Sequence, residues 1–262
     1  MELWLHTFAF PGKVADVARQ GEQWDFAGLL VADSQNLTAD IWVELALAGA
    51  ATSTLRVGPG VTNPLTRHLA VTASAAATLQ AETGGRATLG FSQGDSALSQ
   101  VGLRRLSVDE FEHALEILQG FLRGDQAHVD RTTSAIRWLA DSDLPKVPVH
   151  VGATGPRAIA AGAGHAEGVD LTVGASLERV RSGVTIAREA GPPELVLGGV
   201  RERCRRRRPG PGAPAGARQR GDVCPFSADP RAPDDQVAAR VARAYQREQH
   251  GRASASMPRT GR

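Results

Sequence analysis

Cysteine, lysine and long apolar runs are scarce in this chain of 262 residues. Its two cysteines, Cys204 and Cys224, are too few for a disulfide framework or a cysteine-based zinc site. The seven histidines are scattered without HxxxH spacing, so we expect no bound metal. No apolar run approaches about 18 residues, and the first residues show no positively charged segment followed by an apolar one. We therefore expect no signal peptide, no membrane span and a cytoplasmic location.

Positive charge is concentrated near the C-terminal end. Residues 1–198 carry 15 Lys and Arg against 22 Asp and Glu, whereas residues 199–262 carry 15 against 6. Only Lys13 and Lys146 are lysines, so nearly all of this charge is arginine. An arginine-rich arm could bind nucleic acid, but no aromatic side chains alternate with these arginines to stack on bases. We therefore expect no nucleic-acid partner.

The composition changes abruptly at residue 200. Residues 200–233 are rich in Arg, Pro, Gly and Ala without apolar periodicity, and we predict that they are disordered. An out-of-frame reading of GC-rich coding DNA would give such a segment, and a natural disordered linker is the alternative. Residues 234–262 are predicted to hold a helical remnant, with Val237, Val241 and Tyr245 on one face, followed by an irregular tail.

Before residue 200, short apolar segments alternate with helical ones. The predicted strands cover 3–8, 28–32, 55–58, 86–91, 147–151, 169–173 and 195–198. The predicted helices cover 11–24, Thr38 or Asp40 to 50, 70–79, Ser107 through Leu122, 155–164 and 177–190. This repeat predicts an α/β fold over 1–199, a (β/α)8 TIM barrel whose eighth strand cannot be identified.

Two details concern the middle of the chain. Ser107 and Glu110 form a predicted capping box that opens a helix with Phe111, Leu115, Leu118 and Leu122 on one stripe. Residues 125–145 are polar and irregular, and we expect an excursion at the barrel rim. We expect the segment 99–145 to select the substrate.

Two stretches carry most of the functional signal. Gly58–His68, with the sequence GPGVTNPLTRH, follows the third predicted strand, and Gly84–Asp95 ends just beyond the fourth. The carboxyl ends of parallel strands are where α/β folds bind ligands. These residues resemble the luciferase-like flavin and deazaflavin family, in particular the branch similar to methylenetetrahydromethanopterin reductase, which uses coenzyme F420.

The resemblance implies a luciferase-like barrel that transfers hydride between coenzyme F420 and an unknown small organic substrate. An FMN-dependent monooxygenase is an alternative within the same class. A third alternative is an inactive or merely cofactor-binding fragment from a frame-disrupted gene, because the eighth strand is missing. The candidate assembly is a homodimer.

The resemblance also assigns roles at the third strand. It implies a bulge with a non-prolyl cis peptide at Gly60-Val61 that supports the back of the cofactor ring, with Thr62 and Asn63 following in register. A plain β-turn that uses glycine for a positive φ is the alternative.

Two further loops hold candidate carboxylates. Asp33 and Ser34 could bond the ring edge or its hydroxylated side chain, although both could simply cap the turn. Several relatives carry a histidine at position 34, so the serine argues against histidine acid–base chemistry there. Gly94 and Asp95 resemble a second polar contact to cofactor or substrate, with a surface turn as the alternative.

The last candidate group could hold the cofactor phosphate. Thr154, Gly155, Pro156 and Arg157 enter a helix, where backbone N–H groups and the arginine attract anions. A common structural Gly-Pro helix entry is the alternative. His6 could face the barrel mouth or be a satisfied core residue, and with Asp33 and Asp95 it completes the set of candidate catalytic residues.

Overall fold

The computed structural model describes residues 2–129, 131–140, 142–174 and 176–199, so the predictions for 200–233 and 234–262 lie outside it. The strands are β1 (Trp4–Phe8), β2 (Gly28–Ala32), β3 (Arg56–Pro59), β4 (Leu89–Phe91), β5 (Ala127–Val129), β6 (Thr132–Ser134), β7 (Val149–Ala153), β8 (Gly168–Leu171) and β9 (Val196–Gly199). The helices are α1 (Val14–Gln23), α2 (Ile41–Ala50), α3 (Leu69–Glu82), α4 (Ser96–Ser99), α5 (Val108–Arg123), α6 (Arg137–Ala140), α7 (Pro156–His165) and α8 (Leu177–Ala190).

Parallel strands form the wall of the barrel. One group has the order β1-β2-β3 and the other β4-β7-β8-β9. The two groups meet where Val57 N donates to Arg86 O at 2.9 Å and Thr62 N donates to Gly90 O at 2.9 Å. This order of strands with intervening helices is that of a (β/α)8 barrel. An eighth strand of the wall is not among the residues described.

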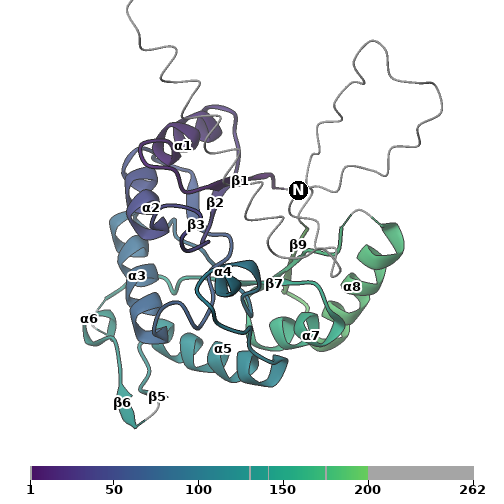
Figure 1. Ribbon diagram of the computed structural model, residues 1–262. Helices are drawn as coiled ribbons and strands as arrows, with labels where there is room; N and C mark the ends of the chain where they lie inside the picture. The colour runs from purple at the N-terminus through teal and green to yellow at the C-terminus, as the bar shows by residue number, and fades with distance from the viewer. Residues whose placement is uncertain (1, 130, 141, 175, 200–262) are drawn as a thin grey trace, which may run out of the picture. The chain divides into compact units, whose positions relative to one another are not determined.

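Helices cover the outer side of this wall. Figure 1 shows α1, α2, α3, α5, α7 and α8 following one another around the strands. The predicted stripe of α5 is buried throughout, which confirms that it faces the core. The capping box is also confirmed, because Glu110 N donates to Ser107 Oγ at 3.2 Å and Ser107 N donates to Glu110 Oε2 at 2.7 Å. Asp40 rather than Thr38 caps α2.

The strand faces differ in composition. Residues such as Val57 are fully buried in the core, whereas the alternating positions include many glycines. Large side chains lie over some of these glycines, so that a Cβ at Gly28 would be 2.2 Å from Trp4 and one at Gly168 would be 2.8 Å from His150. A larger residue at either position would therefore displace the ring of Trp4 or of His150.

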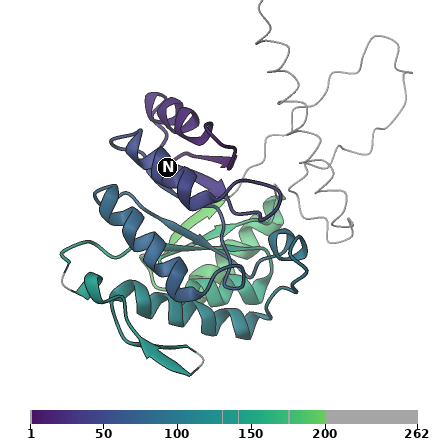
Figure 2. The same ribbon diagram turned by 60° about the vertical axis from the view of Figure 1, so that its left-hand side comes forward.

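The segment 125–145 is more regular than predicted. It contains the antiparallel hairpin β5–β6 and the short helix α6, which project at the end of α5 (Figure 2). Gln80 ties its far end to the start of β4, because Nε2 donates to Pro145 O and Oε1 accepts from Ala87 N. The segment thus lies where strands begin. This position removes residues 125–145 from the expected substrate selector 99–145. The start of α5 stays at the carboxyl ends, because Asp109 pairs with Arg157 just after β7.

Two features are absent from the described part of the chain. None of its helices is both long and apolar enough to cross a membrane. Its His, Asp and Glu side chains nowhere form a group of three or more that could hold a metal ion.

Candidate active site

The hydrogen bonds of Asp33 join the carboxyl ends of β2 and β3. Asp33 follows β2 and is only 5% exposed. Its Oδ2 accepts a 2.6 Å bond from Thr62 Oγ1, and its Oδ1 accepts a 2.6 Å bond from Gln35 Nε2. Burial raises the pKa of Asp33 above its ordinary value, although the bond from Thr62 and the charge of Arg67 oppose the shift. The carboxyl group therefore takes up a proton more readily than an exposed aspartate.

The turn after β3 is held between the neighbouring strands. The Gly60–Val61 peptide bond is cis, as the resemblance implies. Gly60 N donates to Val31 O at 2.8 Å, and Ser92 N donates to Thr62 O at 3.0 Å. A Cβ at Gly60 would lie 2.5 Å from Leu30 Cβ, so the backbone passes too close for any larger residue.

His6 contacts this turn from β1. Its Nε2 lies 2.5 Å from Gly60 O. A carbonyl oxygen can only accept, so Nε2 must carry the proton that is donated. This places His6 beside Gly60, where it holds the carbonyl in place and commits its Nε2 proton to that bond.

Glycines of β4 and β7 lie beneath the side chain of Val61. A Cβ at Gly90 would lie 3.2 Å from Val61 Cγ1, and one at Gly152 would lie 3.1 Å away. The inner surface of the barrel next to the turn therefore consists of backbone atoms at these two positions, without side chains. We did not identify Gly90 or Gly152 from the sequence, although glycine within a strand is a known signal of close approach.

Several side-chain groups near these strand ends have no partner among the described residues. Asn63 is buried, and its Oδ1 accepts bonds of 3.0 Å from Leu65 N and Thr66 N, but its Nδ2 is unpaired. Oε1 of Gln35 is likewise buried and unpaired. Thr66 Oγ1 and Arg67 Nε in the same loop as Asn63 are buried and unpaired as well, so the site offers spare donors and at least one spare acceptor. Gln35 was missed from the sequence, where its place two residues after Asp33 was the available signal.

The loop after β4 contributes differently from expectation. Gly94 has a φ of +76° and packs against the turn of β3, since a Cβ there would lie 3.0 Å from Asn63 Cβ. Asp95 is exposed, and its Oδ1 lies 3.2 Å from Arg105 Nη1. Within the described chain, no hydrogen bond or ion pair joins Asp95 to Asp33 or His6. Ser34 opens a turn in which its carbonyl oxygen accepts from the backbone N–H of residues 37 and 38.

The entry to α7 provides backbone donors rather than a free cation. Gly155 is the N-cap and Pro156 the first helical residue, and no side chain caps the helix. Thr154 Oγ1 lies 2.9 Å from Oγ1 of Thr172, a residue that sequence analysis missed. Arg157 Nη2 lies 2.6 Å from Asp109 Oδ1 on α5, with both side chains exposed. Asp109 would therefore compete with an anion for Arg157, although an ion pair this exposed is weak.

Proteins similar to this chain in sequence include 5,10-methylenetetrahydromethanopterin reductases. The chain is 30% identical over 151 residues to a 5,10-methylenetetrahydromethanopterin reductase of Methanolobus tindarius, covering 55% of this chain and 45% of that protein. It is 41% identical over 87 residues to the reductase of the same name from Methanopyrus kandleri, covering 33% and 25%. The aligned region thus spans less than half the length of either relative.

Solved structures share the fold at lower identity. The coenzyme F420-dependent tetrahydromethanopterin reductase of Methanopyrus kandleri has a TM-score of 0.59 at 22% identity, covering 76% of this chain and 65% of that one. An F420-dependent secondary alcohol dehydrogenase has a TM-score of 0.61 at 18% identity, with coverage of 76% and 68%. A monooxygenase from Streptomyces bottropensis has a TM-score of 0.59 at 19% identity, with coverage of 75% and 70%.

The match to a family model covers most of the described chain. The model of the luciferase-like monooxygenases aligns with residues 4–196, from the start of β1 to the start of β9. The luciferase-like barrel is also the fold of the structural neighbours. The chain therefore belongs to the luciferase-like monooxygenase family of oxidoreductases.

Proposed function

We propose that this protein transfers hydride between coenzyme F420 and a small organic substrate at the carboxyl ends of its strands. The observation that carries the proposal is the convergence of His6, Asp33 and Thr62 on the turn at Gly60-Val61. These residues come from three neighbouring strands. The relatives named as F420-dependent enzymes support F420 as the cofactor.

The spare groups of the site fit a deazaflavin. The polar edge of such a ring carries both acceptors and a donor, and Asn63 Nδ2 and Gln35 Oε1 are unpaired groups of the two matching kinds. Gly90 and Gly152 let the side chain of Val61 pack directly against β4 and β7, which fixes the turn that would support the ring. The uncapped N–H groups at the start of α7 suit the cofactor phosphate.

Each residue has a defined task in this proposal. A bound deazaflavin would supply the hydride chemistry at its C5 position. The turn at Gly60-Val61 would support one face of the ring, while His6 fixes the carbonyl of Gly60. Asp33 would hold or release the proton that accompanies hydride transfer, because burial raises its pKa. Asp95, which is exposed, would make a polar contact to the substrate.

Two alternatives have their own support. The name of the matched family and the monooxygenase from Streptomyces bottropensis favour a monooxygenase, for which we expect FMN as the cofactor. A protein that binds cofactor without turnover is favoured by the described strands, which lack an eighth member of the wall. Both alternatives use the same turn at Gly60-Val61.

Binding of F420 and FMN to the purified full chain separates these functions. We expect F420 to bind with higher affinity in isothermal titration calorimetry, and we expect substrate-dependent loss of the absorbance near 420 nm of oxidised F420. Tighter binding of FMN would favour the monooxygenase, and binding without any turnover across a set of alcohols and reduced pterins would favour the inactive fragment.

A variant pair tests the position of the ring. Gly60→Val should abolish F420 binding with helix content nearly unchanged, because the new Cβ would lie 2.5 Å from Leu30 and 3.2 Å from His6. Gly199→Val is the control, since no heavy atom lies within 4 Å of an added Cβ there. Equal F420 affinity of Gly60→Val and the wild type would contradict the proposed site. Size-exclusion chromatography tests the expected homodimer.

A further inference from the structure

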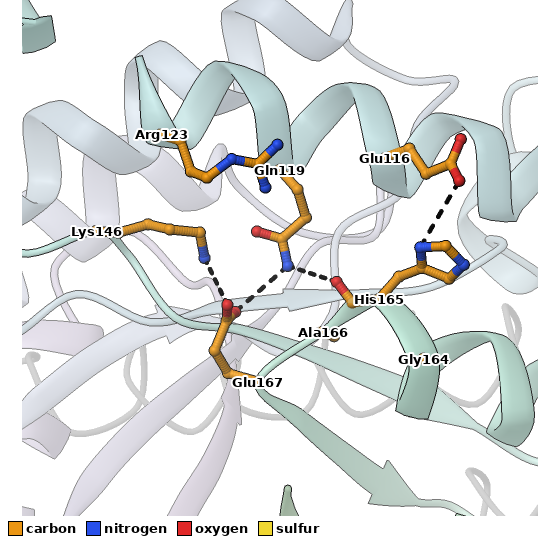
Figure 3. A pocket seen from close by; sticks show the side chains of 8 residues that line it. All are labelled: Glu116, Gln119, Arg123, Lys146, Gly164, His165, Ala166 and Glu167. Carbon is orange, nitrogen blue, oxygen red and sulfur yellow. Dashed lines mark hydrogen bonds and ion pairs between the residues drawn. The ribbon is translucent and has the colours of Figure 1, made fainter. Parts of the chain in front are cut away.

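A polar hollow lies between α5 and α7, away from the proposed cofactor site. Its volume is about 430 Å³, and Figure 3 shows its lining. The polar side chains that line it are Glu116, Gln119, Arg123, Lys146, His165 and Glu167. Lys146 precedes β7 and Glu167 immediately precedes β8, so the hollow lies where the strands begin. Asp33 and Gly60 lie at the opposite ends of their strands.

Gln119 places an unpaired acceptor in this hollow. The residue is only 5% exposed, and its Nε2 donates to His165 O at 2.7 Å and approaches Glu167 Oε2 at 3.4 Å. A flipped amide would set Oε1 against these two oxygens, so the orientation is fixed. Oε1 has no partner among the described residues. Figure 3 shows it directed toward the side of the hollow where Lys146 and Arg123 lie.

The carboxylate of Glu167 cannot supply the missing donor. Burial raises the pKa of Glu167, but hydrogen bonds from Lys146 Nζ and Val149 N outweigh burial and hold the pKa below its ordinary value. Glu167 is therefore ionised near neutral pH and can only accept. A donor for Gln119 Oε1 has to come from a molecule that enters the hollow.

Two cations retain unused donors beside this acceptor. Lys146 Nζ donates to Glu167 Oε1 at 2.8 Å and Val147 O at 3.2 Å, which leaves one of its three N–H groups. Arg123 Nε donates to Asp125 Oδ2 at 2.7 Å, and its terminal nitrogens have no partner within the described ranges. The hollow thus combines donors on two cations and one buried acceptor with the carboxylates of Glu116 and Glu167. Glu116 lies beside His165 (Figure 3), so an anion would bind on the side of Lys146 and Arg123.

We propose that this hollow binds inorganic phosphate through Arg123, Lys146 and Gln119. The unprotonated oxygens of hydrogen phosphate would accept from Arg123 and Lys146, a pairing that guanidinium and ammonium groups favour. Its P–OH group would donate to Gln119 Oε1. Sulfate has a similar size and charge but carries no O–H near neutral pH, so it cannot satisfy the glutamine. Discrimination between these two anions is the signature of the site.

Titration calorimetry of the full chain at neutral pH and constant ionic strength tests the proposal. Phosphate should bind at one site. Sulfate should bind at least about tenfold more weakly, because a hydrogen bond to a buried acceptor is lost. Arg123→Gln should weaken phosphate binding by about tenfold. Arg19→Gln is the matched control, because Arg19 is 53% exposed and paired with Asp16, as Arg123 is 52% exposed and paired with Asp125.

A second variant isolates the acceptor. In Gln119→Leu the preference for phosphate over sulfate should disappear, and circular dichroism shows whether the variant is folded. If it does not fold, the comparison of the two anions on the wild type decides the matter. The proposal would be overturned if phosphate did not bind or if sulfate bound equally well. It would also be overturned if Arg123→Gln and Arg19→Gln lost the same phosphate affinity. None of these outcomes depends on F420.

Discussion

The hydroxyl group of Thr62 donates a 2.6 Å hydrogen bond to Oδ2 of Asp33 across the carboxyl ends of β2 and β3. Both residues are buried, so the bond is shielded from water. It links the turn after β3 to the carboxylate whose pKa is raised. The position and the protonation of Asp33 therefore depend on a residue 29 positions later in the chain.

Replacing Thr62 by valine should destabilise the protein. The hydroxyl is lost while the shape is kept, and buried Asp33 loses a charge-assisted bond, at a cost of about 1.5–3 kcal/mol in the free energy of unfolding. Thr72→Val is the matched control: Thr72 is also fully buried, but its Oγ1 has no partner among the described residues. Urea unfolding should show a large loss for Thr62→Val and little change, or a gain, for Thr72→Val. Equal losses would contradict the role of this bond.

The raised pKa of Asp33 predicts a pH dependence of stability. The folded protein binds this proton more tightly than the unfolded chain, whose carboxyl group has the ordinary value of 3.8. The contribution to stability is therefore fully present below pH 3.8 and is lost as pH rises through the folded pKa. Asp33→Asn removes this titration. The free energy of unfolding of the variant should therefore fall less than that of the wild type as pH rises from 3.8 through the folded pKa of Asp33. Parallel urea unfolding curves at several pH values measure the difference.

The lowered pKa of Glu22 predicts the opposite change of stability with pH. Its Oε1 accepts bonds from the backbone N–H groups of Ser53, Thr54 and Leu55 and from Thr54 Oγ1, which lowers its pKa from 4.5 to about 2. The stabilisation is present above pH 4.5 and is lost as pH falls toward 2. Glu22→Gln should cost about 1 kcal/mol at pH 7, allowing for screening by solvent. The gap between variant and wild type in urea unfolding should narrow below pH 4.5.

Two helix glycines should respond oppositely to alanine. In α5, a Cβ at Gly120 would meet no atom closer than 3.8 Å, so Gly120→Ala should stabilise by about 0.5–1 kcal/mol through its helix propensity. In α7, a Cβ at Gly162 would lie 2.8 Å from Val151, so Gly162→Ala should destabilise by about 1–3 kcal/mol. Thermal melts of both variants test the pair. A stabilised Gly162→Ala would show that α7 can move away from β7.

Local signals were enough to identify the elements of the barrel. Apolar runs predicted the seven strands of the wall, and the Ser107–Glu110 capping box marked the start of α5. Such features depend on residues that are close in sequence, where periodicity and capping act directly. The hairpin β5–β6 was missed because its exposed strand Thr132–Ser134 has no apolar pattern.

The partners of the candidate site residues required the tertiary structure. Sequence analysis singled out His6, Asp33 and Thr62, and proximity along the chain could not show that His6 and Thr62 meet at the turn of β3. It also could not show that Asp109, 48 residues earlier, pairs with Arg157, the cation predicted to contact phosphate. Pairing of charges depends on how α5 packs beside α7, which no local pattern encodes.

The sequence alone determined the βα repeat, the resemblance to the luciferase-like family and the cofactor class to test, because these follow from periodicity and short motifs. The tertiary structure decided which groups remain unpaired. Asn63 Nδ2, Gln35 Oε1 and Gln119 Oε1 are identical in type to amide groups elsewhere in the sequence. They differ because packing removed water from them without supplying a partner, and only the arrangement of distant segments determines that outcome.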